Sequence, residues 1–310
     1  MSTLAATLVG FSAIILWSLL AALTAAAGPI PAFQMNAMCF GIGALAAALL
    51  WVRDPSRARA LRQPWHVWAH GVAGLFGYHA LYFAALRLAP PAEASLVNYL
   101  WPLLIVLFSS LLPGERLRAI HVAGALIGFG GVVTLSLSAD LSARPEHALG
   151  YVLAFAAAMF WSSYSVLSRR MASVPTDAVV GFCAVTALLS VVCHVLFETT
   201  VWPATPGAWA AIIALGLGPV GAAFYAWDIG CKRGDIRLLG VLSYAAPVLS
   251  TLALVVAGFA HTTLALWIAC TLIVTGALVA SSGTLFSKKR ERHDVKETGS
   301  ASTPTRSGLP

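Results

Sequence analysis

The chain has 310 residues, of which 59% are hydrophobic and only 10% are charged, and its mean hydropathy is +0.83. This composition excludes an ordinary soluble domain and indicates a membrane protein. The formal net charge of +7 does not indicate a nucleic-acid partner, because the basic loops lack the repeated aromatic residues of a single-strand binder. We expect the positive charge to orient the chain and to contact anionic lipid head groups.

Ten apolar stretches follow one another along the chain, and each is long enough to cross the ~30 Å hydrocarbon core as a helix. They cover residues 3–26, 30–51, 67–88, 91–112, 118–137, 148–170, 177–197, 207–230, 236–258 and 262–285. The first resembles a signal peptide, with Ala25-Ala26-Ala27 as a cleavage site. It has no Lys or Arg at its start and is longer than a signal core, so we expect it to remain as a span.

Aromatic residues near the middle of the spans define the candidate site. Trp and Tyr usually gather at the two membrane interfaces, and at mid-depth their N–H and O–H groups need partners that hydrocarbon lacks. We therefore predict a wet, protein-lined cavity, with ordinary helix packing as the alternative. In chain order, the predicted substrate-binding residues are Trp17, Tyr78, His79, Tyr82, Asn98, Tyr99, Trp101, Trp161, Ser165, Ser243 and Tyr244.

His79 is the one ionisable side chain near the middle of a span, and it shares a helix face with Tyr82. An ionisable group at that depth indicates function, although a packing histidine is the alternative. No Asp or Glu lies near the middle of any span, so a cationic substrate lacks a counter-charge. An uncharged or zwitterionic substrate with an apolar body fits better, and Asn98, Ser162, Ser165 and Ser243 are expected to hydrogen-bond its polar end.

Pro102 and Pro247 interrupt the fourth and ninth spans. Each removes a backbone donor and frees a carbonyl, which favours a bend. We predict hinges at both prolines, with plain kinks as the alternative.

Other polar and aromatic residues need no functional explanation. Trp51 is expected in an aromatic belt at one interface. His194 and Glu198, one turn apart, predict a pair near the end of the seventh span, and Asp228 lies one turn from Lys232. The five cysteines form no CxxC pair and predict no metal site, and we expect no cofactor.

The second half of the sequence repeats the first at a shift of about 145 residues. The shift places Trp17-Ser18 on Trp161-Ser162, Tyr99 on Tyr244 and Pro102 on Pro247. Each half has five spans, an odd number, so the halves must be inverted relative to each other. The predicted fold class is an all-α membrane protein with ten transmembrane helices in two inverted five-helix repeats, at 1–140 and 148–286. Residues 287–310 predict a disordered cytoplasmic tail.

The basic residues predict the orientation. Seventeen of the nineteen Lys and Arg residues fall on one side of this topology, and only Arg87 and Arg144 fall on the other. Cytoplasmic loops carry the Lys/Arg excess, so both termini are expected in the cytoplasm of a bacterial-type inner membrane.

The stretch LYFAALRLAPPAEASLVNYLWPLLIVLFSSLLPGERL and the following GALIGFGGVVTL resemble the ten-helix EamA-type exporters of the drug/metabolite transporter superfamily. Within it, GPIPAFQMNAMCFGIGAL and LVNYLWPLLIVL are most similar to the aromatic amino acid exporters. The family pattern repeats a glycine-glutamate after the ninth helix. Here Gly114-Glu115 ends the fourth span, whereas Gly258-Phe259 ends the ninth.

The predicted function is export of small metabolites, above all aromatic and other apolar amino acids, by alternating access through a midplane cavity. An exporter of drugs, nucleosides or sugars on the same fold is the alternative. A channel would need a polar lining along its whole pore. A membrane enzyme is disfavoured because the chain has no HExxH, GxSxG or DxxxD-like set near a helix end. The expected partners are a small-molecule substrate and the bilayer, and the expected oligomeric state is a monomer.

Overall fold

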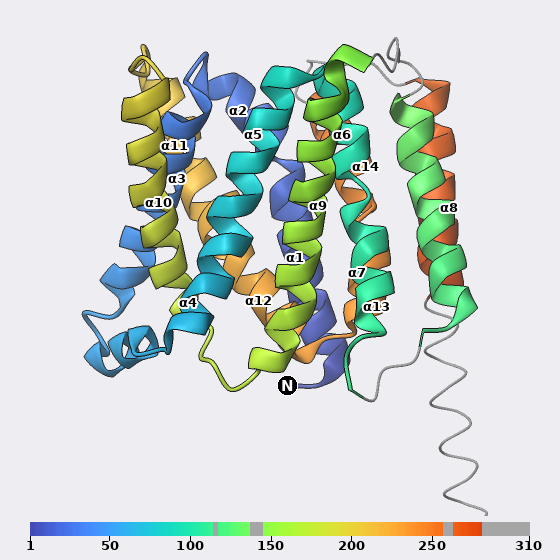
Figure 1. The fold of residues 1–310 in the computed structure, drawn as a ribbon, viewed down its shortest axis with the longest axis horizontal. Helices are drawn as coiled ribbons and strands as arrows, with labels where there is room; N and C mark the ends of the chain where they lie inside the picture. The colour runs from blue at the N-terminus through green and yellow to red at the C-terminus, as the bar shows by residue number, and fades with distance from the viewer. Residues whose placement is uncertain (114–116, 137–144, 257–262, 281–310) are drawn as a thin grey trace, which may run out of the picture.

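The computed structural model describes residues 1–113, 117–136, 145–256 and 263–280, and within these ranges the chain is helical without any β-strand (Figure 1). The boundaries predicted at 140 and 286, the glycine pairs at 114–115 and 258–259, and the tail 287–310 lie outside the described residues. The helices are α1 Thr3–Ser18, α2 Leu20–Ala27, α3 Ala32–Leu50, η1 Pro55–Leu61, α4 Trp65–Val72, η2 Ala73–Gly77, α5 Tyr78–Leu88, α6 Pro91–Asn98, α7 Trp101–Ser109, α8 Ala119–Ser136, η3 Pro145–His147, α9 Ala148–Ser168, η4 Arg169–Met171, α10 Ala178–Phe197, α11 Pro206–Leu215, η5 Gly216–Ala222, α12 Ala223–Arg233, α13 Ile236–Leu242, α14 Ala245–Val256 and a last helix, Leu264–Ala280.

The helices stand side by side and run between two faces of the molecule (Figure 1). We call the end at which α1 begins the N-terminal face and the other end the opposite face. Within the described residues, six helices or continuous helical runs are long and apolar enough to cross a membrane, and three shorter apolar helices accompany them, namely Glu93–Ser109, Ala119–Thr134 and Leu264–Ala280. Each lies at a stretch predicted from hydropathy.

Two continuous helical stretches, 65–88 and 206–233, contain a wider, π-helical turn. One is η2, between α4 and α5, and the other is η5, between α11 and α12. Pro219 lies inside η5, where a missing N–H is tolerated because the turn is already irregular. These turns change the direction in which the following side chains of α5 and α12 point.

Two other stretches are interrupted by a short turn. The helix stops at Tyr99–Leu100 between α6 and α7, and at Ser243–Tyr244 between α13 and α14. Pro102 is the second residue of α7, and Pro247 is the third residue of α14. A proline in a first helical turn costs no hydrogen bond. The chain therefore turns just before each proline rather than at it.

The outward surface is apolar. Leu45, Leu49, Val195 and Leu278 are between 60% and 73% exposed, and exposed apolar area on this scale is typical of a surface covered by lipid. Trp51 follows the last residue of α3, and its side chain is packed rather than exposed: it is 9% exposed and belongs to a buried cluster.

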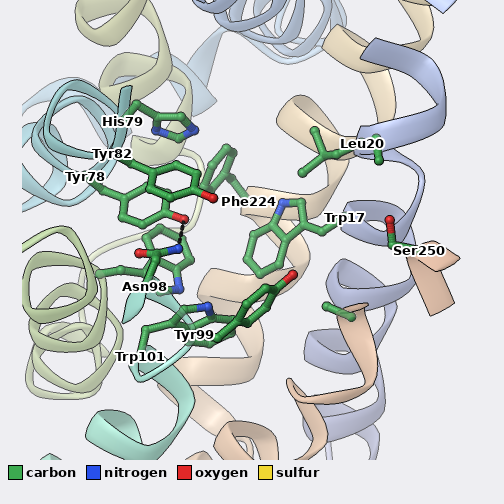
Figure 2. Close-up of a pocket in the computed structure, with 13 residues that line it drawn as sticks. Trp17, Leu20, Tyr78, His79, Tyr82, Asn98, Tyr99, Trp101, Phe224 and Ser250 are labelled. Atoms are coloured by element: carbon green, nitrogen blue, oxygen red, sulfur yellow. Dashed lines mark hydrogen bonds between the residues drawn. The ribbon is translucent and has the colours of Figure 1, made fainter. Parts of the chain in front are cut away.

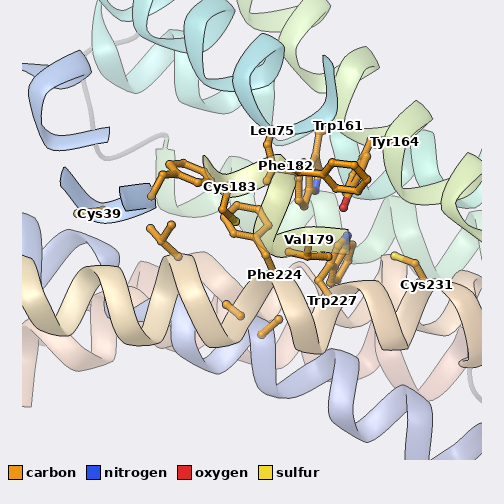
Figure 3. Close-up of a cluster of buried hydrophobic side chains, with 14 of the residues drawn as sticks. Cys39, Leu75, Trp161, Tyr164, Val179, Phe182, Cys183, Phe224, Trp227 and Cys231 are labelled. Carbon is orange, nitrogen blue, oxygen red and sulfur yellow. The ribbon is translucent and has the colours of Figure 1, made fainter. Parts of the chain in front are cut away.

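The buried cluster in Figure 3 draws side chains from α3, α9, α10 and α12, with Trp161, Phe182 and Phe224 among them. Small residues allow the closest approaches: a Cβ added to Gly10 of α1 would lie 2.9 Å from Gly230 Cα of α12. A Cβ added to Gly124 of α8 would lie 2.6 Å from the Gly276 carbonyl oxygen of the last helix.

The predicted side-chain pairs form. His194 Nδ1 lies 3.0 Å from Glu198 Oε2, and Lys232 Nζ lies 2.8 Å from Asp228 Oδ2. Glu198 also accepts hydrogen bonds from the backbone N–H groups of Phe33 and Gln34 at the start of α3. It thereby joins α3 and α10 at the opposite face through a helix cap.

Candidate functional site

A cavity of about 320 Å³ lies at the centre of the molecule. It is lined by Trp17, Leu20, Ala21, Tyr78, His79, Tyr82, Asn98, Tyr99, Trp101, Trp161, Phe224, Ala246 and Ser250. Figure 2 shows Tyr78, His79 and Tyr82 of α5 with Asn98 on one wall, and Trp17, Leu20 and Ser250 on the wall opposite. The space therefore lies between elements of both halves of the sequence.

Eight of the eleven predicted substrate-binding residues line this cavity. They are Trp17, Tyr78, His79, Tyr82, Asn98, Tyr99, Trp101 and Trp161. They meet because α1, α5 and α9 direct their mid-helix aromatic residues inward, and because the break between α6 and α7 brings Asn98, Tyr99 and Trp101 to the same space.

Ser165, Ser243 and Tyr244 are placed elsewhere. Ser165 Oγ accepts a hydrogen bond from Trp227 Nε1 at 3.1 Å, in the layer behind the cavity wall. Ser243 Oγ donates to the Leu239 carbonyl oxygen at 2.7 Å and is fully buried. Tyr244 turns away into the separate cluster formed with α8 and the last helix.

The aromatic side chains contact one another around the cavity. The rings of Trp17 and Trp161 meet edge to face with centroids 5.5 Å apart, and Trp101 meets Trp161 in the same way at 6.4 Å. Tyr78 and Tyr82 stack with centroids 5.9 Å apart. The wall therefore offers flat and edge surfaces to an aromatic ligand.

Asn98 has a side-chain acceptor that lacks a hydrogen-bond partner among the described residues. Its Nδ2 donates to the Tyr78 hydroxyl at 3.1 Å, whereas its Oδ1 is buried without a partner among the described residues. The residue is 4% exposed. A buried acceptor with no partner is costly, and a bound molecule toward which the Asn98 amide turned would satisfy it.

His79 is held in one orientation. Its Nδ1 lies 2.7 Å from the Leu75 carbonyl oxygen, which fixes the proton on Nδ1 and leaves Nε2 as the acceptor. The ring meets Phe40 edge to face at 5.2 Å and Phe224 at 6.3 Å. In the described part of the chain, none of the residues that line the cavity is Asp, Glu, Lys or Arg. The site therefore suits a ligand whose own charges balance or are absent.

Sequence reasoning missed five lining residues, which are Leu20, Ala21, Phe224, Ala246 and Ser250. The repeat contained a signal for two of them. Phe224 lies 145 residues after His79, and Ala246 lies 145 residues after Trp101. Applying the shift to the predicted site would have found both.

The cavity ends before it reaches the N-terminal face. Trp227, one turn beyond Phe224 in α12, is fully buried and stacks on Trp161 with centroids 5.9 Å apart. Beyond it, α1 and α12 touch at Gly10 and Gly230. The Asp235 N–H donates to Thr7 Oγ1 at 2.8 Å, which ties the two halves together at that face.

Comparison with known proteins assigns this chain to a family. The EamA-like transporter family matches twice, at residues 4–137 and 148–282. A protein of Ancylobacter novellus named aromatic amino acid exporter YddG is 59% identical over 283 residues, which cover 91% of this chain and 98% of the relative. A protein of the same name from Salmonella typhimurium is 28% identical over 272 residues, covering 81% and 88%. A crystal structure with 59% identity aligns with a TM-score of 0.88 over 94% of this chain and 100% of its own.

Proposed function

Because the chain belongs to the EamA-like transporter family, we propose that it exports aromatic and other apolar amino acids across a bacterial-type inner membrane. The observation that carries the proposal is the central cavity, walled by aromatic rings and free of formal charge among its described lining residues. The 59% identical relative carries the name of an aromatic amino acid exporter. The chemistry proposed is transport, not catalysis.

Substrate recognition divides between rings and polar groups. The aromatic side chain of the substrate packs against Trp17, Trp101 and Trp161, where each aromatic pair contributes about 0.5–1.5 kcal/mol beyond area burial. The ammonium group donates to Asn98 Oδ1, whose acceptor position is open. The hydroxyl of Tyr99 and Nε2 of His79 hydrogen-bond the polar end of the molecule, and Tyr78 and Tyr82 orient it.

Ten transmembrane helices arranged as two inverted five-helix repeats form the proposed architecture, with the first repeat at 1–140 and the second at 148–286. Two coincidences support it. The π-helical turns η2 and η5 begin 143 residues apart, and the breaks at Tyr99 and Tyr244 lie 145 residues apart. Irregular turns are costly, so a repeat explains why they recur at nearly one shift.

Both termini are proposed to be cytoplasmic, which makes the N-terminal face the inner one and 287–310 a cytoplasmic tail. Four arginines between α3 and α4 support this, since cytoplasmic loops carry the Lys/Arg excess. The chain is proposed to work as a monomer, because each half of the chain already contributes residues to the cavity.

The cavity and the closure below it support an outward-facing state. Leu20 and Ser250 line the side toward the opposite face, while Gly10 and Gly230 hold α1 against α12 at the inner one. Alternating access requires this contact to open and an equivalent one to close on the other side. The interruptions before Pro102 and Pro247 are the proposed hinges, because each proline lacks the N–H that would bond the turn before it.

The proposal is tested by uptake into proteoliposomes that contain the purified protein. Radiolabelled phenylalanine, tryptophan, leucine and methionine are expected to enter, and lysine, glutamate, a cationic dye and a nucleoside are not. Running each uptake with and without a pH gradient separates proton coupling from facilitated diffusion. Transport of the nucleoside or dye with no transport of phenylalanine would overturn the substrate class and favour the alternative.

A further inference from the structure

A second cavity lies at the molecular surface, away from the candidate site. It has a volume of about 420 Å³ and shares no residue with the central cavity. We call it the α3–α12 groove. It is lined by Gly43, Ala46, Ala47, Leu50, Trp51, Arg57, Asp177, Leu217, Gly221, Ala222 and Tyr225.

Small residues create this groove. A Cβ on Gly43 of α3 would lie 2.9 Å from the Gly216 carbonyl oxygen and 3.1 Å from Gly221 Cα of η5, so the two elements touch there. Beyond this contact, toward the N-terminal face, alanine side chains leave the space between α3 and α12 unfilled. Leu50 and Leu217 at its walls are 56% and 47% exposed. These walls belong to the apolar outer surface, so an alkyl chain fits the groove better than water does.

The groove ends at an unsatisfied donor. Trp51 lines it and is 9% exposed, and its Nε1 is buried with no hydrogen-bond partner among the described residues. An indole N–H normally finds an acceptor when it is buried. An oxygen-bearing group at the end of an alkyl chain would supply one.

The same end of the groove is basic. Arg57 lines it, and η1 with its flanks adds Arg53, Arg59 and Arg62, all exposed. The carboxylates facing them are Asp177, paired with Arg57 at 2.8 Å, and Asp54, which accepts from the N–H and hydroxyl of Ser56. A further polar neighbour, the Tyr225 hydroxyl, also donates to Asp177.

Arg57 is the guanidinium that lines the groove, and Arg53, Arg59 and Arg62 add positive charge on the same segment beyond the Asp54 and Asp177 carboxylates. Positive charge in excess of the nearby carboxylates selects an anionic group. A zwitterionic choline lipid would bring its own cation to the same place, so its electrostatic attraction to the arginines would be weaker.

We propose that the α3–α12 groove binds one anionic phospholipid, with an acyl chain between α3 and α12 and the phosphate end at Arg57 and Trp51. This site is separate from the transport cavity and does not depend on which amino acid is exported. It needs only that η1 lies at a leaflet containing anionic lipid. Lipid bound there would brace α3 against α12, and α12 carries Phe224 into the central cavity.

Native mass spectrometry of the purified full chain tests the site. Dioleoyl phosphatidylglycerol and dioleoyl phosphatidylcholine are titrated separately, and bound copies are counted. The wild type is expected to hold one phosphatidylglycerol about tenfold more tightly than phosphatidylcholine. Ala47→Phe, which fills the groove, is expected to weaken phosphatidylglycerol binding about tenfold. Arg57→Gln should remove the preference between the two lipids, and Trp51→Phe should weaken both.

Arg233→Gln is the control, because it removes an exposed arginine at the end of α12 that does not line the groove. It is expected to change affinity less than twofold. If Ala47→Phe does not fold, Arg57→Gln and Trp51→Phe decide the question. Equal binding of the two lipids by the wild type would overturn the proposal. A separate titration with phenylalanine gives the other contradicting result. If the wild type binds two phenylalanine molecules and Ala47→Phe binds one, with phosphatidylglycerol binding unchanged, the groove is an amino-acid site.

Discussion

Trp17 and Trp161 are 144 residues apart in the sequence, yet their rings meet edge to face with centroids 5.5 Å apart at the centre of the molecule. Trp17 Nε1 also donates to the Pro219 carbonyl oxygen in η5 at 2.9 Å. Both rings line the central cavity, so each half of the chain contributes an indole to one wall. A movement of the halves relative to each other must therefore reshape the site, as alternating access requires.

The contact between α1 and α12 gives the first prediction. Gly10→Ala places a Cβ 2.9 Å from Gly230 Cα, so the two helices must separate. We expect a loss of about 1–3 kcal/mol in stability, the usual cost of overpacking, seen as a lower midpoint of thermal unfolding in detergent. Gly130→Ala is the matched control, because nothing lies within 4 Å of its added Cβ. Equal midpoints for the two variants would show that the helices are not pressed together at Gly10.

Asn98 is predicted to set the affinity for zwitterionic substrates. Asn98→Ala removes the open acceptor and is expected to raise the KM for phenylalanine about tenfold, the equivalent of one charge-assisted hydrogen bond. Asn98→Asp keeps the acceptor and adds a negative charge, so uptake of the cationic analogue phenylalaninamide should rise relative to phenylalanine. An unchanged KM in Asn98→Ala would remove Asn98 from the binding site.

Variants of His79 distinguish substrate binding from proton transfer. If Nε2 binds substrate by a hydrogen bond, His79→Gln should keep part of the transport rate and His79→Ala should lose most of it. If His79 carries a proton, both variants should lose any response to a pH gradient. His66→Ala, an exposed histidine in α4, serves as the control. Normal phenylalanine transport by His79→Ala, with unchanged pH dependence, would make His79 a packing residue.

The topology is predicted from the charge distribution. An epitope placed after Pro310 should resist protease in intact cells and be cleaved once the membrane is opened. The charge excess predicts that the tail lies in the cytoplasm. Cleavage in intact cells would show that both halves have the opposite orientation to the one proposed.

Hydropathy predicted the helices closely, because crossing a membrane imposes a length and a composition that can be read directly. The described ends of α3 and α10, for example, lie within two residues of the expected spans 30–51 and 177–197. The breaks at Tyr99 and Tyr244 were not predicted at their true places. Proline was expected to mark them, but a proline fits the first turn of the next helix better than the break itself.

The candidate site was predictable where depth alone decides, as for Trp17 and Trp161. It was not predictable where rotation about a helix decides. Tyr244 corresponds to Tyr99 in the repeat but faces Phe129 of α8, with centroids 6.2 Å apart. Phe224 was passed over because a phenylalanine in an apolar helix carries no polar atom to mark it. Only the repeat shift of 145 residues, applied to His79, identifies Phe224.

Counterflow of radiolabelled phenylalanine into proteoliposomes, comparing the wild type with Trp101→Ala, tests the central claim most directly. Trp101 is 6% exposed and forms part of the cavity wall, whereas Trp202 is 67% exposed and serves as the control in Trp202→Ala. With equal amounts of folded protein in the vesicles, Trp101→Ala is expected to lower the initial rate about tenfold, because the substrate loses a large aromatic contact. Trp202→Ala should transport at the wild-type rate. A wild-type rate in Trp101→Ala would contradict an aromatic central binding site.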